Sequence, residues 1–237
     1  MAGLTFSLAG RWLAAVSCRL NIRRKRQFGR RRNHKEDIFL SEDINLAPPG
    51  GGLPNLERLA ASSLLQGMRA VLPKNLLSRW LRRETANVLA LAASLPEALT
   101  SRRVLTPRLT GLEDDSRYWS ANMVLQHLVI VDRGIRELAI ALADGQTFAR
   151  QVRIAEVKPE ASAGAEQQGL LQGAVDDYLD LIDTLGNLRT AGRHAHPWFG
   201  ELDLRGWHAL SAMHATAHRR QMQCIVGLLR QAEIRHP

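Results

Sequence analysis

Apolar residues between positions 124 and 142 recur at alternating steps of four and three, and this pattern constrains the fold more than any other feature of the chain. Such spacing is typical of a helix that buries one stripe against neighbouring helices. The segment 171–185 repeats it, and the chain after residue 53 shows almost no alternation of period two. The two stripes consist of Val124, Leu128, Val131, Ile135, Leu138 and Leu142, and of Leu171, Val175, Tyr178, Ile182 and Leu185. An all-α protein is therefore predicted.

Breaker residues divide the chain into helical stretches whose number and length predict a four-helix bundle. The four expected helices span about 84–99, 117–142, 165–188 and 204–232. The expected connections are an irregular segment at 100–116, an extended piece at 148–157 and a loop at 192–200. A further helical stretch at 53–82, interrupted by Pro73, precedes them. The bundle is thus assigned to residues 83–237, and 53–82 is expected to pack outside or before it.

The net positive charge of the chain comes entirely from its first 35 residues. Residues 1–35 hold ten basic side chains and no acidic one, whereas the rest of the chain holds 22 basic and 23 acidic groups, a balance of −1. This distribution argues against a uniformly basic nucleic-acid-binding domain. Residues 1–52 are expected to be a disordered basic leader that ends in a Pro/Gly linker at 47–52. If the leader has a partner, nucleic acid or an anionic membrane fits it.

Several classes of protein are excluded by what the chain lacks. Its two cysteines, Cys18 and Cys224, are far apart and form no CxxC pattern, so neither a disulfide scaffold nor a thiolate metal site is supported. No apolar run approaches the ~18 residues of a transmembrane helix. A secretory signal fits poorly because Arg11 splits the apolar start of the chain. A cytoplasmic protein is expected.

The last predicted helix differs from the others because the middle of its buried stripe is polar. The stripe reads Trp207, Ser211, His214, His218, Gln221, Ile225 and Leu228. Buried polar groups without partners cost about 1–3 kcal/mol each. His214 and His218 lie one turn apart, where two imidazoles can bind one ion, and His127 flanks the apolar stripe of another helix. Three neutral nitrogen ligands suit Zn²⁺ or Ni²⁺.

Two interpretations compete with a simple metal site at these histidines: a zinc peptidase and a metal-free polar patch. A zinc peptidase is excluded because Ala215 follows His214, where the HExxH motif needs its glutamate. A metal-free, hydrogen-bonded polar patch stays open, and convergence of the three rings on one point would decide against it. Four other histidines are weaker candidates, and His208 among them is expected at the surface; they are His194, His196, His208 and His236. The outer partners of the rings are open among Asp132, Asp176, Asp177 and Asp180.

Three segments carry a resemblance to a known family. They are Trp119-Ser120 with Val124–Leu128, the loop His196-Pro197-Trp198-Phe199-Gly200, and Trp207 through Met213-His214 and Ala217–Gln221. In their order and spacing they resemble the DinB-like, damage-inducible superfamily, in the branch with an HP-aromatic-FG loop before the last helix. The resemblance covers about residues 82–230. It implies an up-down-down-up four-helix bundle with one divalent metal held by His127, His214 and His218, the set that the helical stripes also indicate.

The resemblance also implies a chemistry. Some relatives are thiol-dependent transferases, in which the metal binds a low-molecular-weight thiol and lowers its pKa. A hydrolase using metal-bound water, and a non-catalytic metal-binding or interaction module, are the alternatives. Gln221 is the candidate for orienting a bound water or thiol, while Trp198 and Phe199 either line a substrate mouth or pack their loop against the bundle. A small-molecule substrate or thiol is the expected partner, and a homodimer is possible.

Overall fold

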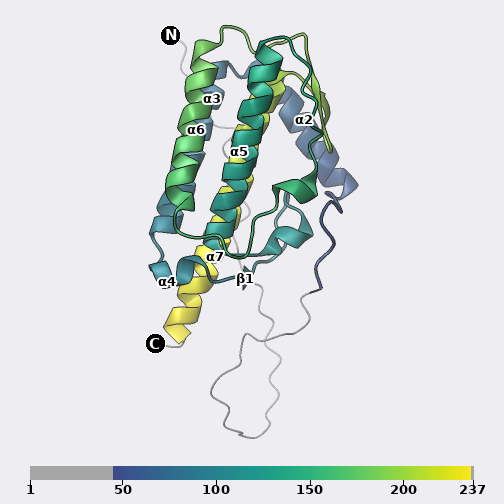
Figure 1. Ribbon diagram of the computed structural model, residues 1–237. Helices are drawn as coiled ribbons and strands as arrows, with labels where there is room; N and C mark the ends of the chain where they lie inside the picture. Colours follow the sequence, from purple (N-terminus) through teal and green to yellow (C-terminus); the bar gives the residue numbers. More distant parts are fainter. Residues whose placement is uncertain (1–44, 236–237) are drawn as a thin grey trace, which may run out of the picture. The chain divides into compact units, whose positions relative to one another are not determined.

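The computed structural model describes residues 45–235 (Figure 1), so the predictions for the basic leader at 1–44 lie outside the described residues. Its helices are α2 (Asn55–Val71), α3 (Lys74–Ala93), α4 (Glu97–Thr100), α5 (Ala121–Ala143), α6 (Gln167–Thr184) and α7 (Leu204–Arg235). Two short 3-10 turns are η1 (Asp114–Arg117) and η2 (Ile154–Val157). Two antiparallel strand pairs join β1 (Val104–Leu105) to β2 (Tyr118–Trp119), and β3 (His194–His196) to β4 (Gly200–Leu202).

Helices α3, α5, α6 and α7 form a four-helix bundle, as predicted, and α2 packs against α7 outside it. Helices α3 and α7 run in the same direction, because Ser78 contacts His208 near their starts and Arg230 donates to the Ser94 carbonyl near their ends. Helix α5 lies antiparallel to α7, since Gln221 in the second half of α7 donates to the Ser116 carbonyl just before α5, while Leu142 near the end of α5 lies beside Gly192 in the loop before α7.

A long crossover, residues 144–166, makes α5 and α6 parallel. It begins at Gly145, whose φ of +70° suits glycine at the end of a helix. It then returns along α5, where Arg150 pairs with Glu137 and the Glu160 amide donates to Gln126 near the start of that helix. Helix α6 therefore starts at the same end as α5, which gives the up-down-down-up order. The piece expected to be extended at 148–157 contains the 3-10 turn η2 instead.

The predicted apolar stripes form the core. In α5 every stripe residue is buried except Val131, which is half-buried, and in α6 all but Leu185 are buried. On α7 the polar middle of the stripe is also largely enclosed, with Gln221 only 1% exposed and His214 half-buried. Polar side chains in the centre of the bundle thus need partners inside the protein or a bound group.

The expected break near residue 83 is wrong. Helix α3 continues without interruption through Arg83 and Glu84, and the Glu84 carboxylate accepts hydrogen bonds from Arg219 of α7. The actual break lies at Leu72–Pro73, because proline disfavours helical backbone in the residue before it and cannot donate its own amide. The first helix of the bundle is therefore the second half of the predicted extra segment joined to 84–93.

Caps fix the two helices that carry the candidate site. Ser120 Oγ accepts from the Met123 amide at 3.2 Å and begins α5. Asp203 Oδ1 accepts from the Gly206 amide at 2.9 Å and begins α7. The same carboxylate takes two hydrogen bonds of 2.7 Å from Arg69, so one side chain both caps α7 and holds α2 to it.

The segment predicted to be a linker packs onto the bundle from residue 47 onward. Glu113 accepts hydrogen bonds from the Gly50 amide at 3.3 Å and the Gly52 amide at 2.8 Å, and Asp114 accepts from the Ala47 amide at 3.0 Å. Gly50 and Gly52 have φ of +80° and +75°, a conformation that other residues rarely adopt. The glycines therefore serve a defined contact. Within residues 45–235, no helix has the length and apolar character needed to cross a membrane.

Candidate metal centre

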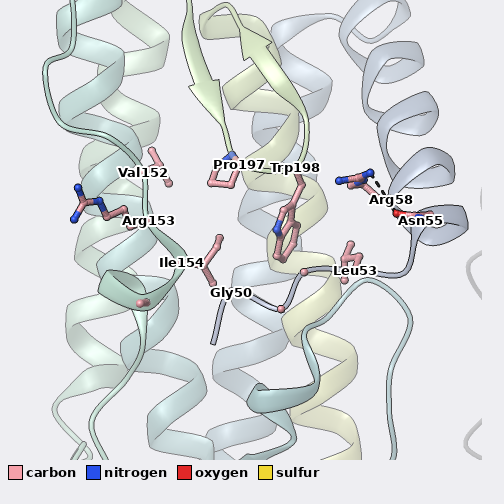
Figure 2. Close-up of a pocket in the computed structure, with 12 residues that line it drawn as sticks. Gly50, Leu53, Asn55, Arg58, Val152, Arg153, Ile154, Pro197 and Trp198 are labelled. Carbon is pink, nitrogen blue, oxygen red and sulfur yellow. Dashed lines mark hydrogen bonds between the residues drawn. The ribbon is translucent and has the colours of Figure 1, made fainter. Parts of the chain in front are cut away.

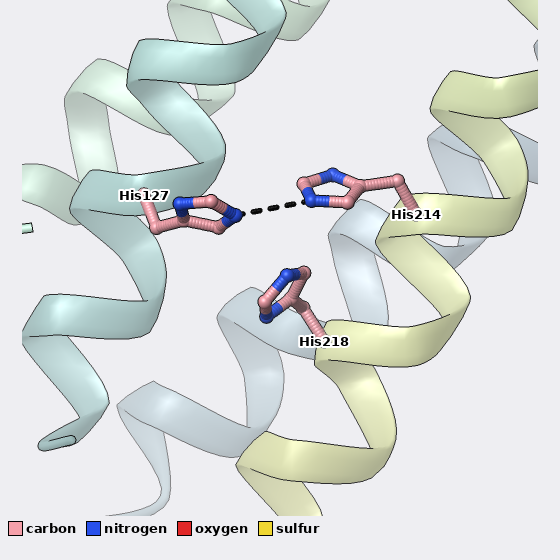
Figure 3. Close-up of side chains that lie close together, drawn as sticks. All are labelled: His127, His214 and His218. Carbon is pink, nitrogen blue, oxygen red and sulfur yellow. Dashed lines mark hydrogen bonds between the residues drawn. The ribbon is translucent and has the colours of Figure 1, made fainter. Parts of the chain in front are cut away.

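His127 of α5 and the pair His214 and His218 of α7 point toward one another across the bundle (Figure 3). Their ligand nitrogens all lie within 4.8 Å of one another, and the Nε2 atoms of His127 and His214 are 3.1 Å apart. Two nitrogens bound to one tetrahedral zinc ion at ~2.05 Å would be roughly 3.3 Å apart. These three histidines lie close enough to hold a metal ion.

Hydrogen bonds on the outer side orient two of the three rings. His127 Nδ1 donates to the Val157 carbonyl at 2.7 Å, and His218 Nδ1 donates to Gln221 Oε1 at 2.8 Å. Because both oxygens only accept, each Nδ1 carries the hydrogen and each Nε2 keeps a lone pair. Gln221 itself is fixed by its Nε2, which donates to the Ser116 carbonyl at 2.6 Å. Both rings are therefore held in the tautomer that a metal ligand requires.

The third ring lacks such support. His214 Nδ1 is buried and has no hydrogen-bond partner among the described residues, while its Nε2 faces the lone pair of His127. In the absence of an ion, His214 Nε2 can carry the hydrogen and donate to the His127 Nε2 lone pair. With an ion between the rings, both Nε2 atoms would present lone pairs to it, and three convergent imidazole nitrogens suit a borderline divalent ion.

Burial keeps the rings neutral, as metal binding demands. It lowers the pKa of His127 to about 4. It also lowers the pKa values of His214 and His218 well below that of an ordinary histidine, with a further contribution from the neighbouring imidazoles. Trp119 closes one side, stacked on His218 with ring centroids 6.0 Å apart and tilted against His127 at 5.1 Å. Its indole forms an apolar wall for which the sequence indicated no role.

The outer partners differ from the four aspartates considered from the sequence. In the described part of the chain none of those carboxylates hydrogen-bonds to the three rings; the acceptors are the Val157 carbonyl and Gln221. Asp176 instead accepts from Gln172 on α6, and Asp132 is buried, which raises its pKa to about 7. A backbone carbonyl thirty residues away leaves no signal in the side-chain pattern.

His208 is not at the surface, as expected from the sequence, but fully buried. Its Nε2 lies 3.1 Å from Ser78 Oγ on α3, and its Nδ1 lies 3.0 Å from the Tyr178 hydroxyl on α6. The prediction failed because α7 contacts α3, α5 and α2, so residues beside its main stripe are also enclosed.

The HP-aromatic-FG loop is the turn of the β3–β4 hairpin directly before α7. Three residues connect the strands, and Gly200 follows them with a φ of +69°, as three-residue hairpin loops favour. Phe199 stacks on His196 with ring centroids 4.8 Å apart and packs against the core, whereas Trp198 lines a cleft. Phe199 therefore has the packing role that was one of the two expectations, and a role of Trp198 at a substrate mouth stays a prediction.

Comparison with known proteins yields little. No family model and no curated protein matches the chain. Among solved structures, the crystal structure of TT2238, a four-helix bundle protein, is similar, with 20% sequence identity and a TM-score of 0.45 over 64% of this chain and 98% of that one. The four-helix architecture described above rests on this chain's own helix contacts.

Proposed function

We propose that this bundle is a metal-dependent enzyme of the DinB-like class that transfers a small thiol to an electrophile. The observation that carries the proposal is the convergence of His127, His214 and His218, with two rings turned by Val157 and Gln221 so that Nε2 faces the centre. The order of the hairpin and the last helix supports the family assignment. A zinc or nickel ion fits the three imidazoles.

Three protein ligands leave a coordination position open, as in catalytic and not structural zinc sites. A metal bound there would act as a Lewis acid that lowers the pKa of a thiol or a water. In the transfer, the thiol sulfur forms the new S–C bond, the leaving group departs with its electron pair, and the thiol proton passes to solvent. Trp119 would exclude water from one side of the centre.

Gln221 is the candidate for orienting a bound thiol or water, and it also contacts one of the three rings. Its Oε1 accepts from His218, and its Nε2 donates to the Ser116 carbonyl. We therefore assign it the positioning of the His218 ring.

The metal assignment is tested by metal analysis of the purified full chain, its His214→Ala variant and a His194→Ala control that removes a histidine outside the set. We expect about one equivalent of divalent metal per chain in the wild type and the control, and almost none in His214→Ala. Full occupancy in His214→Ala would overturn the ligand assignment.

The activity is tested by loading the protein with Zn²⁺ or Ni²⁺ and offering cysteine or glutathione with 1-chloro-2,4-dinitrobenzene. Thiol-dependent chloride release that is lost in His214→Ala is the expected result. Hydrolysis of p-nitrophenyl esters without thiol would favour the hydrolase alternative. A loaded protein inactive in both assays would favour a non-catalytic metal-binding module.

A further inference from the structure

A cleft of about 560 Å³ opens on the flank of the bundle (Figure 2). Three segments far apart in the sequence form it: the glycine segment 50–53 with the start of α2, residues 152–155 of the crossover, and Pro197 with Trp198 of the hairpin loop. The glycine segment is held in place by Glu113, as described above. The cleft is thus a built feature with anchored walls.

Two of these wall segments are adjacent in the chain to residues near the candidate metal centre. Val157, which orients the His127 ring, lies two residues after the cleft residue Ala155 in the same 3-10 turn. On the other side His196 precedes Pro197, and its imidazole is close enough to contribute to the lowered pKa of His214. Two of the wall segments of the cleft are therefore continuous in the chain with residues that contact or influence the three histidines.

The cleft has a mixed lining of apolar side chains, glycine backbone and two arginines, of which Arg58 has no acidic partner among the described residues. Trp198 stands in its centre, with Ile154 and Leu53 on either side, and Arg58 extends toward the indole from α2 (Figure 2). The Arg58 guanidinium contacts the neutral Asn55 amide at 3.3 Å, which leaves its charge uncompensated there.

The second arginine of the lining differs. Arg153 extends away from Trp198 in Figure 2 and lies 3.6 Å from the Glu156 carboxylate. None of the residues that line the cleft is acidic. An indole with the Arg58 guanidinium beside it is suited to an aromatic molecule that carries one acid group.

We propose that this cleft binds an amphipathic organic anion, an aromatic carboxylate or sulfonate whose rings lie on Trp198 and whose acid group pairs with Arg58. That such a molecule is the electrophilic substrate of the metal centre is an inference that rests on the proposed function. That it binds in the cleft does not depend on that function.

The binding is tested with two fluorescent probes of the same aromatic body, 8-anilinonaphthalene-1-sulfonate and its uncharged parent N-phenyl-1-naphthylamine. Metal-stripped full-length protein is titrated with each, so that failure of the metal function leaves this result intact. We expect Arg58→Gln to weaken sulfonate binding about five- to tenfold and to change binding of the parent less than about twofold. Trp198→Ala weakens both probes, and the matched control Arg153→Gln changes neither.

Equal binding of both probes to the wild type, or sulfonate binding unchanged in Arg58→Gln, would overturn the anion assignment. Binding unchanged in Trp198→Ala would place the probes elsewhere, for example on the exposed Leu56 and Leu59 of α2, and would overturn the cleft.

The substrate role is tested in the metal-loaded protein with 4-chloro-3,5-dinitrobenzoate against 2-chloro-1,3-dinitrobenzene, which lacks the carboxylate. Arg58→Gln should raise KM for the benzoate about fivefold and leave the uncharged electrophile unchanged. Equal effects on the two electrophiles would contradict the substrate role, while the probe titrations still decide the binding.

Discussion

The bundle contains two groups of buried histidine that differ in how their ring nitrogens are satisfied. His208 has a protein partner on each nitrogen, the Ser78 and Tyr178 hydroxyls. In the other group, His127 and His214 turn Nε2 atoms toward one another at 3.1 Å, and His214 Nδ1 has no partner among the described residues. Burial is common to both, so burial alone does not indicate a metal site. The hydrogen bonds of each nitrogen separate a structural histidine from a candidate ligand.

Metal binding should give the largest difference between the two groups. Zn²⁺ at a thousand times its Kd should stabilise the wild-type protein by about 4 kcal/mol, because the ion binds the assembled histidines of the folded state. His208→Ala should keep this increment and His214→Ala should lose it. Urea unfolding with Zn²⁺ or with a chelator measures it. An equal increment in His214→Ala would show that the ion binds elsewhere.

In the absence of metal, His208→Ala should lower the free energy of unfolding more than His214→Ala does. His208→Ala leaves a cavity and two buried hydroxyls without their partner, which should lower the free energy of unfolding by about 3 kcal/mol. His214→Ala also removes a ring, but one that is half-buried and whose Nδ1 has no partner among the described residues, so it should lower the free energy of unfolding by less than His208→Ala does. Urea unfolding in chelator compares the two directly. A larger loss in His214→Ala would favour a structural role for that ring.

Acid should act through His208 as well. Burial lowers its pKa to about 4, with smaller effects of Lys74 and Asp183. Below pH 6.5 the His208 imidazole is protonated in the unfolded chain but stays neutral in the folded protein. The contribution of the neutral, buried His208 to the free energy of unfolding is therefore fully present above pH 6.5 and is lost as the pH falls. The loss is roughly 1.4 kcal/mol per pH unit, about 3 kcal/mol by pH 4.

The control for this acid sensitivity is His208→Gln, which does not titrate. In metal-free protein, its stability should fall less steeply than that of the wild type between pH 6.5 and pH 4.5, as measured by urea unfolding at each pH. Parallel curves for the two proteins would show that His208 is protonated equally in both states.

The smallest expected effect concerns the outer partner of His218. Gln221→Met removes the acceptor that orients the ring and should weaken metal affinity about 10- to 100-fold, as is usual for such partners. The matched control is Gln223→Met, because Gln223 lies on the exposed side of the same helix. Competition with a chromophoric chelator measures both. Equal affinities in the two variants would show that Gln221 does not support the site.

Much of the bundle could be predicted from the sequence, because helical stripes are local in the chain. The steps of four and three on α5 identified the buried face, with Val131 alone half-exposed. The start of α3 was misplaced by about ten residues, although Pro73 marked the interruption of the first helical stretch. Glu84, expected to begin a helix, instead lies within α3 and pairs with Arg219 of α7.

The candidate site was predictable to the same degree. His214 and His218 share a helical face, which any helix of this sequence would present, and the polar middle of the stripe showed that they needed partners. The environment of His208 was not predictable, because three neighbouring helices decide whether a position beside the stripe is covered.

The sequence by itself determined three of the four bundle helices, their buried faces and the three histidines, since each depends on residue type at a fixed spacing along one helix. Only the tertiary structure decided which nitrogen of His127 and of His218 is free, because the Val157 carbonyl that orients His127 and the Ser116 carbonyl that fixes Gln221 come from other segments. The tertiary structure also decided that the Gly50 and Gly52 amides donate to the Glu113 carboxylate beside the cleft. Backbone groups carry no side-chain identity, so their contacts arise only when distant segments meet.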